Sequence, residues 1–153
     1  MKKQVLPLLA FLTASLFLLI SSCDKKDDAP AKTKTQLVTQ SSWIFQSAFW
    51  GSTDVSNQDP PFKTCRKDNI ITFTSAGGGT VTEGAIACSP PEPITFTWSF
   101  TNGETILHVN TPLYPGTGND FTVISISETL LVLQASYTPT VGPTILINIT
   151  FHH

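Results

Sequence analysis

The sequence has little charge and no concentration of positive charge. Charged residues make up 13% of the 153 positions, with nine Lys and Arg against eleven Asp and Glu. A nucleic-acid-binding surface needs a basic patch, commonly with aromatic residues among the cations, and no segment of the chain has this pattern. We therefore expect no nucleic-acid partner.

Motifs of common catalytic sites are also missing. The sequence contains no Gly-x-Ser-x-Gly, no His-Glu-x-x-His and no phosphate-binding glycine loop. His152 and His153 are terminal and are expected to fray, and His108 has only Glu104 as an acidic neighbour on the same strand face. The other loop carboxylates are expected to be solvated: Glu83, Glu92 and Glu128. These absences predict a protein that is not an enzyme and holds no metal or cofactor.

One long apolar run is present, from Val5 to Ile20. Lys2 and Lys3 precede it, Pro7 lies within it, and it is shorter than the roughly 20 residues that span a bilayer as a helix. A charged start, an apolar centre and small residues at the end are typical of a secretion signal. An uncleaved anchor helix is the alternative.

The run ends in an aliphatic residue, two small residues and a cysteine: Ile20-Ser21-Ser22-Cys23. This resembles the lipobox of bacterial lipoprotein precursors. The resemblance implies that residues 1–22 are a cleaved lipoprotein signal peptide and that Cys23 becomes the lipidated N-terminus. Acyl chains such as palmitate would then hold the protein in a membrane, each contributing about 0.8 kcal/mol per buried methylene.

The mature chain would have 131 residues (153 − 22), with seven basic and eleven acidic residues and a formal charge of −4. This length suffices for one domain. Residues 23–36 are polar and are expected to be a flexible tether, followed by a domain over residues 37–153. The run Lys25-Lys26-Asp27-Asp28 resembles an export signal of Bacteroidota lipoproteins, which implies the cell envelope, at the surface or periplasmic face of the outer membrane. A solvated charge run is the alternative.

Cys65 and Cys88 are the cysteines that remain once Cys23 is assigned to lipid. An even pair in an exported protein predicts a disulfide, which would stabilise the fold by roughly 3 kcal/mol. Two free thiols or half of a metal site are the alternatives, and no Cys-x-x-Cys or nearby histidine favours the metal.

From Trp43 onward the sequence has the alternation of β-strands. The clearest example is Ile94–Phe100, which is followed by the hairpin dipeptide Asn102-Gly103. A short amphipathic turn is expected at residues 35–42. Eight strands are predicted, at residues 43–50, 69–74, 80–87, 94–100, 105–109, 121–127, 130–137 and 145–151.

The connections between these strands are turns or loops without a helical pattern. Short connections favour antiparallel neighbours, and closure of eight strands removes the exposed edges. The predicted fold is therefore all-β, an eight-stranded antiparallel up-and-down barrel. A β-sandwich is the alternative.

Several motifs follow one another in a recognisable order. They are Trp43 at the first strand, Cys65-Arg66-Lys67-Asp68-Asn69-Ile70-Ile71-Thr72-Phe73, the later Cys88, Trp98-x-Phe100-x-x-Gly103, and Ile126-Ser127-x-Thr129-x-Leu131-Val132-Leu133. From Trp43 to Phe151 the chain is similar to lipocalin-like lipoproteins of Bacteroidota. The resemblance implies a lipocalin-like barrel that binds a small hydrophobic ligand. Ser41 stands where vertebrate lipocalins have the glycine of Gly-x-Trp.

Aromatic residues are the candidate ligand contacts, because an eight-stranded barrel either fills its interior or holds one small apolar molecule. The candidates are Trp43, Phe45, Phe73, Phe96, Trp98, Phe100 and Phe121. For each of them the alternative is a purely structural role in the hydrophobic core. Trp50 is expected to be exposed. If the barrel is filled, an interaction or inhibitor module for an envelope protein is the alternative function, with residues 54–63 or 112–120 as the contact loops.

Overall fold

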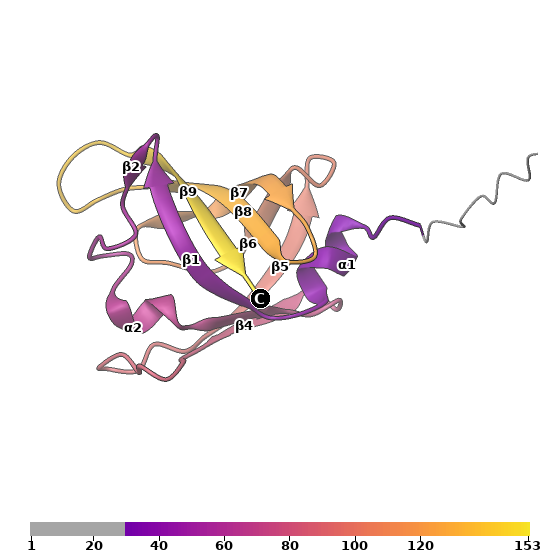
Figure 1. Ribbon diagram of the computed structural model, residues 1–153, viewed down its shortest axis with the longest axis horizontal. Coiled ribbons are helices and arrows are strands. Elements are labelled where there is room, and N and C mark those ends of the chain that lie inside the picture. Colours follow the sequence, from indigo (N-terminus) through magenta and orange to yellow (C-terminus); the bar gives the residue numbers. More distant parts are fainter. Residues whose placement is uncertain (1–29) are drawn as a thin grey trace, which may run out of the picture. The chain divides into compact units, whose positions relative to one another are not determined.

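A computed structural model describes residues 30–153 (Figure 1). The predicted signal peptide (residues 1–22), Cys23 and the charged run at residues 25–28 lie outside the described residues. The elements are α1 (Lys34–Thr39), β1 (Trp43–Trp50), β2 (Thr53–Asp54), α2 (Thr64–Lys67), β3 (Ile70–Phe73), β4 (Gly78–Thr82), β5 (Ile94–Thr101), β6 (Ile106–Val109), β7 (Thr117–Ile126), β8 (Leu130–Tyr137) and β9 (Ile145–His152). Neither helix of this part of the chain has the length or apolarity to cross a membrane.

The strands form one antiparallel sheet in which sequence neighbours are also sheet neighbours from β3 to β9. The sheet closes because β1 pairs with β3 on one side and with β9 on the other, from Ile44↔His152 to Phe49↔Asn148. β2 is a two-residue extension that pairs with the end of β1. The predicted eight-stranded antiparallel barrel is confirmed, and the sandwich alternative is wrong.

Several details differ from the sequence prediction, and one is that β7 begins at Thr117, four residues before the predicted start at residue 121. The stretch between β1 and β3 contains β2 and the one-turn helix α2, where only a loop was expected. β4 begins at Gly78, within the triplet Gly77-Gly78-Gly79 and two residues before the predicted start at residue 80, and it ends at Thr82 instead of Ala87. The triplet suits a strand here because the ring of Phe96 lies over Gly79, where a Cβ would be 2.3 Å from Phe96 Cζ.

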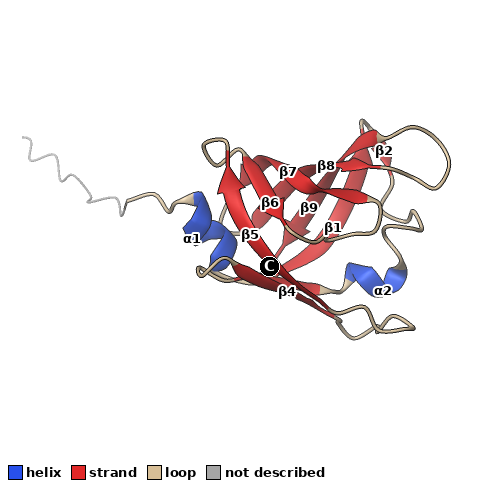
Figure 2. Cartoon of the chain, turned by 180° about the vertical axis from the view of Figure 1, so that it is seen from behind, coloured by secondary structure: helices blue, strands red, loops and turns tan. Residues whose placement is uncertain are grey.

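The two ends of the barrel differ in their connections. One end carries α1 and the short turns that follow β3, β5 and β7, whereas the other carries the long loops 51–69, 83–93, 110–116 and 138–144. Figure 2 shows α1 and α2 at opposite ends. α1 begins inside the predicted tether, at a capping box formed by Thr33 and Gln36. It closes its end of the barrel, where Val38 is fully buried and its carbonyl accepts a hydrogen bond from Trp43 Nε1 at 2.9 Å.

The interior of the barrel is filled with side chains that alternate along the strands. On β8, for example, Leu131, Leu133, Ala135 and Tyr137 are buried, and the residues between them are more exposed. At the centre the following residues meet with no space for a water molecule between them: Trp43, Ile71, Phe73, Leu113, Leu131, Leu133 and Phe151. The closed sheet therefore encloses a core, and any ligand space lies elsewhere.

Candidate functional site

The loop-bearing end of the barrel is closed by two aromatic side chains from different loops. Phe62 comes from the loop after β2 and stacks on Phe45, with ring centroids 4.8 Å apart. Tyr114 comes from the β6–β7 loop and packs edge-on against Phe62 at 5.2 Å. Both rings are almost completely buried, and burial raises the pKa of the Tyr114 phenol, which therefore stays neutral. This plug extends the core to the mouth of the barrel.

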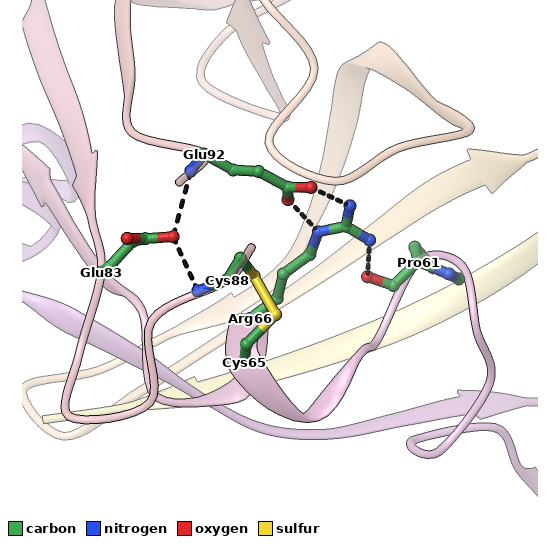
Figure 3. Close-up of polar contacts among 6 residues, drawn as sticks. All are labelled: Pro61, Cys65, Arg66, Glu83, Cys88 and Glu92. Carbon is green, nitrogen blue, oxygen red and sulfur yellow. Dashed lines mark hydrogen bonds and ion pairs between the residues drawn. A yellow bond between two sulfur atoms is a disulfide. The ribbon is translucent and has the colours of Figure 1, made fainter. Parts of the chain in front are cut away.

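The predicted disulfide between Cys65 and Cys88 is confirmed. It joins the short helix α2 to the loop between β4 and β5, with the two Cα atoms 5.1 Å apart (Figure 3). The bond fixes two loops that are neighbours only in space. It therefore sets the position of Arg66, the next residue of α2.

Glu83 organises the loop between β4 and β5, in which Cys88 lies. Its Oε1 accepts a hydrogen bond from the backbone N–H of Cys88 at 2.9 Å and from that of Glu92 at 3.0 Å (Figure 3). These two hydrogen bonds hold Cys88 and Glu92, two positions of the loop between β4 and β5, at one carboxylate. Glu83 was expected to be solvated, and this expectation is wrong because the loop folds around its side chain.

Arg66 and Glu92 form a bidentate, largely buried ion pair (Figure 3). Arg66 Nε donates to Glu92 Oε2 at 2.6 Å and Nη2 donates to Oε1 at 2.9 Å. Nη1 donates to the carbonyl oxygen of Pro61 at 3.2 Å. The Arg66 side chain is 9% exposed and that of Glu92 is 32% exposed. The hydrogen bonds from Arg66 hold the pKa of Glu92 below its usual value, so the pair is charged at neutral pH and has no net charge.

A pocket of about 160 Å³ lies beside this ion pair. Most of its walls are apolar, and it sits where β4, β5 and the β6–β7 loop meet. Its lining residues are Arg66, Asn69, Val81, Glu92, Ile94, Pro112, Leu113, Tyr114, Pro115 and Gly116. It combines an apolar wall with a few polar groups, as small-molecule sites do.

Asn69 is the unusual residue of this pocket. It is only 6% exposed, and its Oδ1 has no hydrogen-bond partner among residues 30–153. Buried side-chain amides in proteins are normally hydrogen-bonded. Asp68 also has a buried Oδ1 without a partner, but its Oδ2 accepts a hydrogen bond from the backbone N–H of Ile86 at 2.8 Å. Sequence reasoning missed Asn69, because an asparagine before a strand is an ordinary turn residue.

The predicted aromatic ligand residues lie in the core, away from this pocket. Phe73 packs edge-on against Phe96 at 5.4 Å and against Trp98 at 5.5 Å. The buried members of the set are Trp43, Phe45, Phe73, Phe96, Trp98 and Phe121, while Phe100 is partly buried. None of the seven lines the 160 Å³ pocket. Their contact with a ligand stays a prediction. Trp50 is 52% exposed, as expected.

The histidines have partners that the sequence did not indicate. His108 Nδ1 lies 2.6 Å from Asp120 Oδ1 on the neighbouring strand, on the exposed outer face of the barrel. His153 was expected to fray, which is wrong, since its ring packs on Trp43 with centroids 4.0 Å apart. Within residues 30–153, no three side chains of His, Cys, Asp or Glu come together as metal ligands would.

Comparison with models of known protein families identifies the family of this domain. A family model described as a lipocalin-like domain matches residues 39–133, from the end of α1 into β8. The matched range covers more than half of the chain and includes Asn69, the ion pair and the disulfide. No curated protein matches the chain.

Proposed function

The chain belongs to the lipocalin-like domain family, and from this membership we propose that it is a lipid-anchored envelope protein that binds one small, largely hydrophobic ligand at the loop-bearing end of its barrel. The observation that carries the proposal is the 160 Å³ pocket with buried Arg66 and Asn69 in its wall. The proposal includes no catalytic step.

The size of the pocket and the filled interior limit the ligand. A cavity of about 150 Å³ accommodates one benzene ring. The pocket therefore suits a molecule, or one end of a molecule, with the size of a single ring. A larger apolar ligand would have to displace the plug of Phe62 and Tyr114, which packs against the core.

The anchoring part of the proposal comes from the sequence. Residues 20–23 resemble a lipobox, and Cys23 would carry the acyl chains that hold the protein in the outer membrane. The Cys65–Cys88 disulfide supports an exported protein, because disulfides persist in oxidising compartments. We expect Cys23→Ala to abolish labelling by radioactive palmitate and to move the protein from the membrane to the soluble fraction. Retained labelling would contradict the anchor.

The ligand-binding part is tested by native mass spectrometry. The chain with Cys23→Ser is exported and purified without detergent, so that acyl chains and micelles do not interfere. A stoichiometric adduct that is lost on denaturation would support a ligand-binding protein. A clean apo mass, together with no uptake of small hydrophobic compounds by the same sample, would contradict it.

A second candidate function is supported by exposed apolar residues. Trp50 is 52% exposed, Leu146 is 57% exposed and Val141 is 88% exposed, and all three lie at or near the loop-bearing end. Exposed apolar side chains of this kind are typical of protein contacts. The filled barrel would then be an interaction module for an envelope protein. A clean apo mass combined with loss of a cross-linked partner on Trp50→Ser would favour this function.

A further inference from the structure

We infer that the pocket beside the Arg66–Glu92 pair selects a compact, uncharged, ring-sized molecule that carries a hydroxyl group, and that Asn69 is the residue that recognises the hydroxyl. This inference rests on the proposed ligand-binding function and gives its chemistry. It follows from the charge, the size and the hydrogen-bonding state of the pocket walls.

The charge of the pocket walls excludes ions. The guanidinium of Arg66 is already matched by the two oxygens of Glu92, at 2.6 and 2.9 Å, and its third bond goes to the Pro61 carbonyl. A carboxylate ligand would have to approach the ionised Glu92 or break its two hydrogen bonds. An ammonium ligand would have to compete with Arg66 for the oxygens of Glu92, beside the positive charge of the guanidinium. A neutral ligand meets neither cost.

The apolar walls favour a compact ring. Val81 and Ile94 come from neighbouring strands, and Leu113 comes from the β6–β7 loop above them. Their side chains lie on the same pocket of about 160 Å³. A molecule that fills this volume with carbon atoms gains free energy from burial, whereas a chain of several polar groups would leave most of them without partners.

Asn69 supplies the polar contact. Asn69 lines the pocket, and its Oδ1 is enclosed by the protein without a hydrogen-bond partner among residues 30–153, which is unfavourable. A rotation of the amide toward the pocket would let a bound ligand donate a hydrogen bond to this oxygen and remove the cost. The amide group also has a donor, its NH₂, which is not among the buried side-chain atoms that lack a partner within residues 30–153. A hydroxyl both donates and accepts, so one such group on a ring matches the amide in either of its two orientations.

The test compares three probes of similar size on the exported full chain with Cys23→Ser. Phenol carries the ring and the hydroxyl, toluene carries the ring alone, and benzoate adds a negative charge. Each is titrated into the millimolar range and followed by amide chemical shifts of Asn69, Val81 and Ile94. We expect phenol to shift these resonances with about tenfold higher affinity than toluene, because one hydrogen bond to a buried group differs between them. Benzoate is expected to leave them unchanged.

The variant Asn69→Leu has nearly the same shape but no hydrogen-bonding group. It should reverse the order of the probes, with toluene at least as tight as phenol. Asn119→Leu, on β7 and outside the pocket, is the matched control and should keep the preference for phenol. Unchanged thermal unfolding midpoints or higher ones would show that the variants are folded. A merely structural role for Asn69 would lower both affinities without reversing them.

The outcomes separate the two proposals. Three results would overturn the inference and leave ligand binding intact. Toluene could bind the natural protein as tightly as phenol, or benzoate could bind it more tightly than phenol. The third is a preference for phenol that survives Asn69→Leu. If none of the probes shifts the pocket resonances, the inference is overturned. The proposed function falls with it only if native mass spectrometry also gives a clean apo mass.

Discussion

Replacement of Asn69 by leucine should make the protein more stable without its ligand. Asn69 is 6% exposed and its Oδ1 has no partner among the described residues. A buried polar group left without a hydrogen bond costs about 1–3 kcal/mol, and replacement by an apolar group of the same shape removes that cost. We expect the free energy of unfolding to rise by about 1–2 kcal/mol, since part of the gain is lost to imperfect packing.

Urea denaturation measures this change at equilibrium. In thermal unfolding, the same gain corresponds to a midpoint increase of about 4 °C for each kcal/mol in a domain of this size. Asn119→Leu is the control at a half-buried strand position and should stay within about 0.5 kcal/mol of the natural protein. The difference in the free energy of unfolding between Asn69→Leu and Asn119→Leu measures the effect of removing the buried amide, because the general effect of adding a leucine is common to both variants.

A loss of stability in Asn69→Leu would refute this reasoning. It would mean that the amide makes a favourable hydrogen bond in solution, for example to water held in the pocket, and that no partner is missing. Addition of phenol gives an independent reading. It should raise the unfolding midpoint of the natural protein through binding to the folded state, and it should raise that of Asn69→Leu by less.

Three further changes probe other parts of the fold. Serine at both Cys65 and Cys88 should lower the free energy of unfolding by about 3 kcal/mol, because the bridge closes a loop with a sequence separation of 23 residues, as urea denaturation would show. Gly79→Ala should cost about 1–3 kcal/mol in the same assay, because its Cβ would lie 2.3 Å from the ring of Phe96. Glu92 has a lowered pKa in the folded state, so it stabilises the fold above its unfolded pKa and loses this effect as the pH falls through the folded value. In the variant Glu92→Gln, the free energy of unfolding should therefore fall less as the pH is lowered. Unfolding curves measured from neutral pH to about pH 3 would show this.

Each of these changes has a control and a contrary result. Reduction of the natural protein should reproduce the serine variants, and equal stability with and without the disulfide would contradict the loop argument. Gly78→Ala, at the neighbouring position of β4, is the control for Gly79→Ala, because its Cβ would come no closer than 3.4 Å to another residue, the hydroxyl of Thr74. Glu104→Gln, in the turn between β5 and β6, is the control for Glu92→Gln. If Glu92→Gln leaves the acid sensitivity unchanged, the ion pair does not control it.

The sequence predicted the fold well because strands carry their pattern locally. The alternation in Ile94–Phe100 marks the inward face of β5, and Asn102-Gly103 marks the hairpin that follows it. Predictions were weaker where a distant contact decides the structure. β4 starts within the glycine triplet because Phe96 packs over Gly79, and no local pattern announces that contact.

The candidate site shows the same division. Cysteine number and an exported context were enough to predict the Cys65–Cys88 bond, which the structure contains. The roles of Glu83 and Glu92 were not predictable, because a carboxylate in a turn is usually solvated and only the folded loop supplies its donors. The aromatic set was chosen for its size and strand position, and these properties describe a core as well as a ligand pocket.

Local pattern and composition were enough to predict an all-β barrel of eight strands and the pairing of Cys65 with Cys88, because both depend on features that the sequence carries directly. The lipoprotein-like N-terminus stays a prediction from the same kind of feature. The filled centre of the barrel and the pocket at its loop-bearing end come from the three-dimensional packing and were not predicted. The same packing buries Asn69, whose Oδ1 has no hydrogen-bond partner among residues 30–153. Cavities and unsatisfied groups depend on how side chains from distant segments pack together, and this packing cannot be read from any one segment.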